Sequence, residues 1–413
     1  MTSFTEHSPK FPDCDYRGDF LKVIDCPCGR EWSSHACSQV EGGICVPNLD
    51  QLNSSAIKVH GPLPECMKCV KRTVNGQVVG IPTRDEVRKL RNLPRKEMTD
   101  AKARRLGIKP VEQAVTDVFP RDRMVSDYEL CRSVLHHDDA EFNPSIIEFE
   151  GQRWIAYRQN WSNSNIVLSK ANPAWEPDCG PDGCRFINIP IEQENSSGRE
   201  DPRLFAFRGE LWVSYSGYCR HGQYGNTVCI GRLRNGAMDC HFPLHYEHRA
   251  RNEKNWVFFE HDNRLFCTYL CTPAHVVLEC DQFNCKLAYA TQWKSPYSTG
   301  HIRGGATPVL HNGEFYHFFH SVTPTYGTKV YTCGVFTFES KPPFRVLRCT
   351  KRPLIAPRVD DGEPGGKSAA VFPGGAVFDN DKRRWHVAYG YLDKECRIAS
   401  FHASDIESEL YAV

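Results

Sequence analysis

The stretch PSIIEFEGQRWIAYRQ at residues 144–159 consists of an apolar strand, a polar turn and a second strand rich in aromatic residues. That pattern predicts a β-hairpin. It recurs four times, with starts roughly 50 to 65 residues apart. The repeats are RLFAFRGELWVSYSG (203–217), NWVFFEHDNRLFCTYL (255–270), TPVLHNGEFYHFFHS (307–321) and AAVFPGGAVFDNDKRRWHVAYGYL (369–392).

Each hairpin is followed by further strand candidates, such as NTVCIGRL at 226–233. Five similar units of about four strands each indicate radial repetition. The fold class expected is therefore all-β, with a five-bladed β-propeller over residues 125–413. A pair of irregular β-sandwiches is the alternative, and it leaves the fivefold recurrence of the hairpin unexplained.

The composition indicates a folded protein without a single dominant charge. The chain has 413 residues, of which 40% are hydrophobic, with 51 Lys and Arg against 50 Asp and Glu. Such an apolar fraction can build a core. A net charge of +1 excludes a protein whose whole surface attracts nucleic acid.

The first residues, MTSFTEHSPKF, are polar and include Glu6, unlike the basic and then apolar start of a secretory signal. The chain also lacks a run of about 18 apolar residues that would span a bilayer. A cytoplasmic protein with no membrane partner is therefore expected.

The twenty cysteines are unevenly distributed, because seven of them lie in the first 69 residues. We expect residues 1–70 to form a small Cys-rich module that needs a bound metal or a crosslink to be stable, since these residues lack long apolar runs. Spaced thiolates and a C-x-x-C pair suit tetrahedral zinc, although an iron–sulfur cluster stays open. The candidate ligands are Cys26, Cys28, Cys37, Cys45, Cys66 and Cys69.

Residues 71–124 are expected to form a basic, helical connector. Residues 68–109 hold thirteen Lys and Arg against four Asp and Glu, a net charge of +9. Two short helices are expected between 83 and 110, broken near Pro94. A solvated linker is one interpretation, and a face for an anionic partner such as nucleic acid is the other.

Polar residues precede the first strand of every predicted blade. In a propeller these positions converge on one mouth of the central channel, so this is where a site is expected. The residues are Glu141 and Asn143; Glu200, Asp201 and Arg203; Glu253, Lys254 and Asn255; His301 and Arg303; and Asp360, Asp361 and Glu363.

The ordered segments SGREDPRLF, EKNWVFF, HIRGGATPVL, FFHS and AAVFPGGAVF resemble glycoside hydrolase family 130, the β-mannoside phosphorylases and hydrolases. They also resemble the related β-1,2-mannosyltransferase propellers. The resemblance covers about residues 130–400. It implies that Asp201 is the catalytic acid, that Arg203 aids substrate binding, and that Lys254, His301, Arg303 and His320 lie where the phosphorylases bind phosphate.

The chemistry of glycosyl transfer fits these residue types. A carboxylic acid must protonate the leaving oxygen while the acceptor enters from the opposite face of the sugar. A water acceptor needs a second carboxylate, for which Glu253 or Asp361 is a candidate. A phosphate or nucleotide-sugar diphosphate instead needs cations. Further substrate contacts are expected from Asn143, Arg158 and Asn255, and Trp161 and Trp256 either stack on sugars or belong to the core.

The function expected is inverting glycosyl transfer on a mannoside-like substrate, by a glycosyltransferase or a phosphorylase, with Asp201 as the general acid. Two alternatives stay open. One is a β-mannoside hydrolase, and the other is a non-catalytic propeller that binds glycans or proteins.

Overall fold

The computed structural model divides the chain into two compact units, residues 1–110 with 325–327 and residues 111–324 with 328–413. Besides the backbone of seven short strands, it describes residues 117–130, 141–159, 164–178, 199–218, 225–235, 237–250, 252–281, 284–324, 329–358 and 369–413.

The described part of the first unit consists of three antiparallel hairpins. They pair β1 (Ile24–Cys26) with β2 (Arg30–Trp32), β3 (Ser38–Val40) with β4 (Ile44–Val46), and β5 (Lys71–Val74) with β6 (Gln77–Gly80). The expected connector therefore begins with strands. The two helices expected between 83 and 110 lie outside the described residues.

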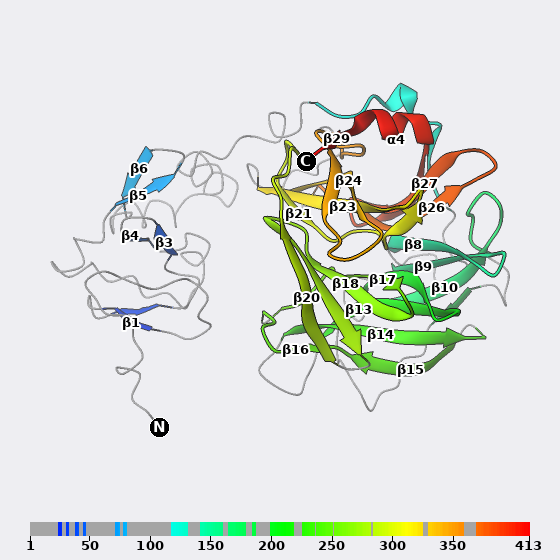
Figure 1. The fold of residues 1–413 in the computed structure, drawn as a ribbon, viewed down its shortest axis with the longest axis horizontal. Helices are drawn as coiled ribbons and strands as arrows, with labels where there is room; N and C mark the ends of the chain where they lie inside the picture. Colours follow the sequence, from blue (N-terminus) through cyan, green and yellow to red (C-terminus); the bar gives the residue numbers. More distant parts are fainter. Residues whose placement is uncertain are drawn as a thin grey trace. The chain divides into compact units, whose positions relative to one another are not determined.

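The second unit is built from five sheets, grouped around one centre (Figure 1). The first two sheets are four-stranded. The first has the order β11 (Cys184–Phe186), β10 (Asn165–Ala171), β9 (Gln152–Gln159) and β8 (Glu141–Phe149). The second has the order β12 (Glu200–Phe207), β13 (Glu210–Tyr218), β14 (Asn226–Arg234) and β15 (Ala237–Pro243).

The other three sheets vary this plan. The third has the order β16 (His245–Tyr246), β20 (Asn284–Gln292), β19 (Ala274–Asp281), β18 (Arg264–Leu270) and β17 (Val257–His261). The fourth contains β21 (His301–Arg303), β22 (Val309–His311), β23 (Glu314–Pro324), β24 (Lys329–Glu339), β25 (Val346–Thr350) and β29 (Leu410–Ala412). The fifth contains β26 (Val371–Asp379), β27 (Arg384–Tyr391), β28 (Glu395–His402) and β7 (Ser126–Glu129).

All five predicted hairpins are confirmed, and the turns explain their register. The pairs Glu150–Gly151, Arg208–Gly209, Asp262–Asn263 and Asn312–Gly313 each have two positive φ angles between 49° and 80°. Two consecutive left-handed residues form the type I′ turn, whose twist matches that of the two strands. Asn, Asp and Gly tolerate this conformation best.

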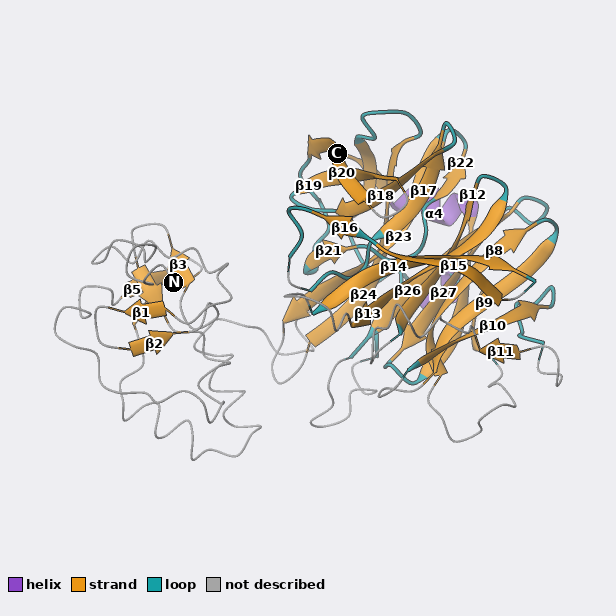
Figure 2. Ribbon diagram, turned by 90° about the horizontal axis from the view of Figure 1, so that it is seen from below, coloured by secondary structure: helices purple, strands orange, loops and turns teal. Residues whose placement is uncertain are grey.

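Strands from distant parts of the sequence complete two of the five sheets. Strand β7, the earliest strand of this unit, pairs with β28 in the fifth sheet. The last strand, β29, pairs with β25 in the fourth. Both pairings cover sheet edges that would otherwise be open. The helix α4 (Ala403–Glu409) precedes β29 and is the one α-helix of the described residues (Figure 2).

The described residues of the second unit form five core clusters, and each cluster joins two neighbouring sheets. Sheets one and two share Leu168 and Val213, and sheets two and three share Ile230 and Leu278. The remaining three clusters join sheets three and four, four and five, and five and one. No sheet buries its faces alone, which is the packing that the repeat predicts.

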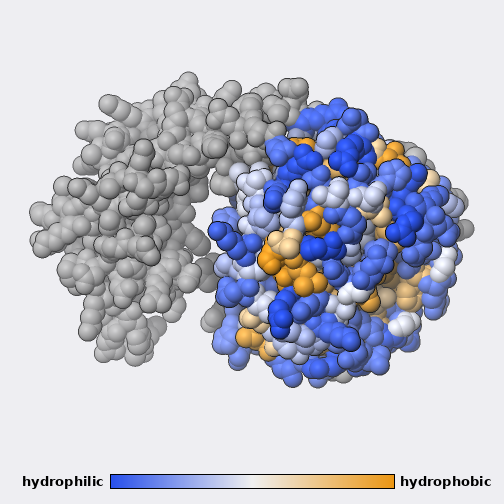
Figure 3. All heavy atoms as spheres, turned by 45° about the horizontal axis from the view of Figure 1, so that its top comes forward, coloured by the Kyte–Doolittle hydropathy of each residue, from blue (hydrophilic) through white to orange (hydrophobic). Residues whose placement is uncertain are grey.

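The later cysteines belong largely to this core. Eight of the nine described free cysteines are buried, and Cys240 is half-buried. Hydrophilic residues cover most of the visible propeller surface (Figure 3). Among the described residues, none of the helices has the length and apolar character needed to cross a bilayer.

Candidate active site

Three polar residues at the starts of the first three blades have a left-handed backbone conformation. Asn143, Asp201 and Asn255 have φ angles of 55°, 57° and 64°. The register of β8 shifts between Phe142 and Ser145, and that of β12 between Glu200 and Arg203, so the first two residues lie at β-bulges. Bulges re-aim side chains next to active sites, and left-handed residues at such places point to function.

The Asp201 carboxyl group has one engaged oxygen and one open oxygen. Asn143 Nδ2 donates a 2.8 Å hydrogen bond to Asp201 Oδ1, and Arg158 Nη1 lies 3.8 Å from the same oxygen. Asp201 is 8% exposed. No hydrogen bond to Oδ2 comes from the part of the chain that the structure describes.

An ion-pair network extends from Asp201 to the next blade. Arg158 Nη2 lies 3.2 Å from Glu200 Oε1, and Lys254 Nζ pairs with Glu200 Oε2. The Glu200 carboxylate therefore bridges cations from the first and third blades. The structure brings Asn143, Asp201, Arg158 and Lys254 together as one cluster, to which Arg158 comes from the second strand of its sheet, β9.

Arg203 points into the protein and joins three blades. Its Nε donates to Gly305 O at 2.6 Å, Nη1 to Asp201 O at 3.0 Å, and Nη2 to Asn255 Oδ1 at 3.0 Å. Its guanidinium carbon lies 5.3 Å from the centre of the Phe372 ring. Burial lowers the pKa of Arg203 to about 10, so the group stays charged at neutral pH. Substrate binding by Arg203 stays a prediction, and these contacts favour a structural role.

Glu253 accepts three hydrogen bonds inside the third blade. Trp256 Nε1 donates to Oε2 at 3.0 Å, while Tyr269 Oη at 3.1 Å and the Ala250 N–H at 2.5 Å donate to Oε1. Burial and the adjacent Glu253 charge raise the pKa of Tyr269. Trp256 is 2% exposed and belongs to the core. The role of base stays a prediction, and the three donors favour the structural alternative.

The fourth blade supplies cationic and neutral nitrogen groups. Arg303 and His301 are exposed on β21, and Arg303 lies opposite His320 on β23. Within the described ranges, Arg303 has no carboxylate partner. Burial, together with the charges of Arg203 and Arg303, lowers the pKa of His320 to about 3. His320 is therefore a neutral imidazole, which provides hydrogen bonds and no positive charge.

The side chains near His320 include three that the sequence did not identify as site residues, Phe372, Tyr331 and His317. Its ring centre lies 4.7 Å from that of Phe372 and 5.9 Å from that of Tyr331. The neighbouring His317 accepts a 3.1 Å hydrogen bond from the Gly305 N–H at Nε2. Phe372 belongs to the VFPGGAV segment, so the motif itself indicated its position.

Other predicted site residues cannot be placed. Asp361, Trp161 and the side chains of the predicted metal ligands Cys26, Cys28, Cys37, Cys45, Cys66 and Cys69 lie outside the described residues. The basic segment 68–109 also lies outside them, apart from the backbone of β5 and β6. Their roles stay predictions.

No protein-family model matches the chain, and no curated protein sequence matches it. Solved structures do. A β-1,2-mannobiose phosphorylase from Listeria innocua is 13% identical, with a TM-score of 0.50 over 67% of this chain and 94% of that chain. A mannose phosphorylase from Leishmania mexicana is 14% identical, with a TM-score of 0.49 over 70% of this chain and 92% of that chain.

A GDP-Man-dependent mannosyltransferase, also from Leishmania mexicana, is 15% identical, with a TM-score of 0.42 over 68% of this chain and 89% of that chain. At such identities the likeness shows the fold alone. The likeness to the Listeria innocua enzyme agrees with the predicted fold, a five-bladed β-propeller.

Proposed function

We propose that the protein is an inverting carbohydrate-active enzyme that transfers a mannosyl-like unit, with Asp201 as its general acid. The observation that carries the proposal is the asymmetric Asp201 carboxyl group. Asn143 and Arg158 fix Oδ1, and Oδ2 is left without a described partner. A positioned carboxyl group of this kind meets the first requirement of glycosidic bond cleavage.

In phosphorolysis, Asp201 Oδ2 gives its proton to the glycosidic oxygen as the bond from that oxygen to the anomeric carbon breaks. A phosphate oxygen forms the new bond from the opposite face of the ring, so the anomeric configuration inverts. The Asp201 carboxylate that remains faces Arg158 Nη1 at 3.8 Å, which stabilises its negative charge. In transfer from GDP-mannose, the Asp201 carboxylate instead accepts the proton of the attacking hydroxyl group, and GDP leaves from the opposite face as an anion.

The co-substrate distinguishes a hydrolase, which uses water, from a phosphorylase, which uses phosphate, and from a transferase, which uses a nucleotide sugar. Hydrolysis needs a second carboxylate about 6.5–9.5 Å from the acid to activate water, and Glu253 is held by three donors. Phosphate and nucleotide sugars need a cation, and Arg303 is exposed without a carboxylate partner among the described residues. These contacts support transferase or phosphorylase chemistry over hydrolysis.

The substrate class follows from the fold comparison and the motifs. The Listeria innocua enzyme, by its name, acts on β-1,2-mannobiose, and the motif EDPR at 200–203 supports the same substrate class through the family resemblance. We therefore favour a β-mannoside as the substrate, with phosphate or GDP-mannose as the co-substrate.

The test compares Asp201→Asn with the native protein. Each is incubated with β-1,2-mannobiose and phosphate, with mannose and GDP-mannose, and with β-1,2-mannobiose in water alone, and the products are analysed. We expect native turnover in one of the first two mixtures and a loss of at least 100-fold in the variant, with unchanged thermal stability. Turnover retained by Asp201→Asn would refute the assignment, and products in water alone would identify a hydrolase.

For the N-terminal module we propose a structural metal, with zinc as the first candidate. All-thiolate sites are usually closed, so the metal would stabilise the module and leave the sugar chemistry to the propeller. Metal analysis of the purified protein tests this. Zinc bound in stoichiometric amounts supports the proposal, and a visible absorption band with bound iron would replace zinc by an iron–sulfur cluster.

A further inference from the structure

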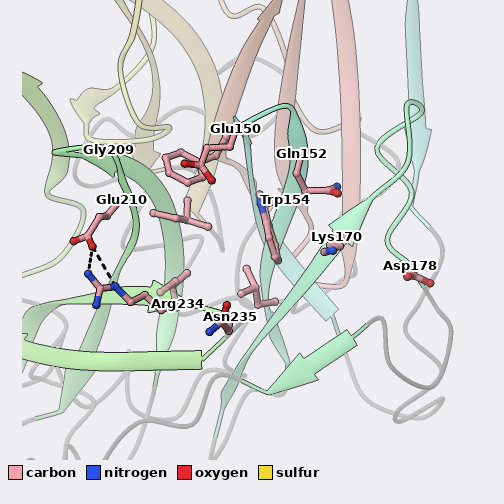
Figure 4. A pocket seen from close by; sticks show the side chains of 13 residues that line it. Glu150, Gln152, Trp154, Lys170, Asp178, Gly209, Glu210, Arg234 and Asn235 are labelled. Carbon is pink, nitrogen blue, oxygen red and sulfur yellow. Dashed lines mark hydrogen bonds and ion pairs between the residues drawn. The ribbon is translucent and has the colours of Figure 1, made fainter.

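A groove of about 770 Å³ lies between the first and second sheets. It is remote from Asp201, because β12 starts beside that residue and ends at the Arg208–Gly209 turn that lines the groove. Eight residues at about 3.3 Å each place the two sites roughly 25 Å apart. Figure 4 shows side chains of both sheets around the groove, among them Gln152, Trp154 and Lys170 on one side and Glu210 and Arg234 on the other.

Trp154 is the main aromatic surface of the groove. Gln152 and Trp154 are two residues apart on β9 and share one face of the sheet. Lys170 lies opposite Trp154 in the register, with Nζ 5.9 Å from the ring centre. The leucines of the floor, Leu168, Leu211 and Leu233, are at most 5% exposed. Phe149 also lines the groove, so the groove presents two partly buried aromatic rings above a buried apolar floor.

Two polar groups in the groove, the Trp154 indole N–H and the Gln152 side-chain carbonyl, are available for hydrogen bonds to a ligand. Within the described residues, the Trp154 indole N–H donates to no acceptor and no donor reaches the Gln152 carbonyl oxygen. The Gln152 amide nitrogen is fixed by a 2.8 Å hydrogen bond to Arg153 O. Uncommitted donors and acceptors beside an aromatic ring match a ligand that carries both hydroxyl groups and an apolar face.

The charges on the rim cancel one another. Glu210 accepts hydrogen bonds from Arg232 at 3.0 Å and from Arg234. Lys170 is the other lining cation, and Glu150 and Asp178 are further acidic residues of the lining. Without an excess of positive charge the groove does not suit a nucleic acid or another polyanion. A neutral ligand fits best.

We propose that this groove is a second, non-catalytic binding site for a neutral oligosaccharide, in which Trp154 stacks on a sugar ring while Gln152 and Lys170 bond to its hydroxyl groups. The choice of a sugar as the ligand rests on the proposed function. The volume of the groove is within the range of about 300–1,000 Å³ found for small-molecule sites. The separation from Asp201 means that the site would hold a glycan chain and leave the reaction to the channel.

The experiment measures the mobility of the full chain in native gels cast with increasing soluble galactomannan. We expect retardation of the native protein, a dissociation constant at least tenfold weaker for Trp154→Ala, and one two- to fivefold weaker for Lys170→Ala. Lys286→Ala, which removes an exposed lysine from the third sheet, is the matched control and should bind as the native protein does.

Trp154 also packs against the core cluster of sheets one and two, so its variant is first checked by denaturation. If it does not fold, Lys170→Ala decides. No retardation of the native protein, or equal binding by Lys170→Ala and Lys286→Ala, would overturn the proposal. Asp201→Asn should bind galactomannan normally in either case. An active Asp201→Asn that still binds would refute the proposed function and leave the groove site standing.

Discussion

Replacing Arg203 by lysine tests whether its guanidinium joins three blades. Arg203 is 2% exposed and donates hydrogen bonds to Gly305 O, Asp201 O and Asn255 Oδ1 over 2.6 to 3.0 Å. A lysine ammonium is a point donor and cannot reproduce the planar fork. With two of the three bonds lost at about 1.5–3 kcal/mol each, we expect a loss of about 3–6 kcal/mol in the free energy of unfolding.

The assay is urea denaturation of the full chain, followed by tryptophan fluorescence. Arg264→Lys is the matched control, because Arg264 forms an exposed ion pair with Glu279 and should change stability by at most about 1 kcal/mol. Equal unfolding free energies for the two variants would refute the structural role of Arg203. A raised KM with unchanged stability would instead support the substrate contact that the motif predicts.

Three further predictions concern the neighbouring groups. Glu253→Gln should cost about 1–3 kcal/mol of stability and less than tenfold in kcat, whereas a loss above 100-fold would identify a base. Burial lowers the pKa of His275 to about 4 and of His320 to about 3. Each histidine therefore binds a proton more tightly in the unfolded chain than in the folded protein. The free energy of unfolding should fall as the pH drops below roughly 6.5, by about 1–2 kcal/mol per histidine at pH 5. His320→Gln should make the free energy of unfolding depend less on pH. Glu200→Gln removes the negative charge that pairs with both Arg158 and Lys254, so kcat/KM should fall, and an unchanged kcat/KM would count against the network.

The sequence predicted the strands well because the signals for them are local. A period of two and a polar turn are readable within sixteen residues, as in 144–159. The entry positions were also predictable, since Asn143 and Asp201 tolerate the left-handed backbone that the bulges require. The repeat then places both residues at one mouth of the channel.

The partners of the site residues were not predictable in the same way. Lys254 directly follows Glu253 in the sequence, but the two side chains have different partners. Successive side chains of an extended segment point in opposite directions. Lys254 accordingly reaches Glu200 of the second blade, while Glu253 turns to Trp256 and Tyr269. Contacts across a propeller depend on blade packing, which no local pattern encodes.

The residues at the starts of the inner strands differ between the first three blades and the last two. Blades one to three enter with Asn143, Asp201 and Asn255, whose side chains bond to one another or to Arg203. Blades four and five enter with glycine pairs, and a Cβ on Gly305 or Gly375 would lie 2.2 Å from Phe318 O or the Ile146 N, respectively. A side chain at either glycine would therefore collide with a neighbouring backbone, so among Asn143, Asp201, Asn255, Gly305 and Gly375 the carboxyl group belongs to Asp201.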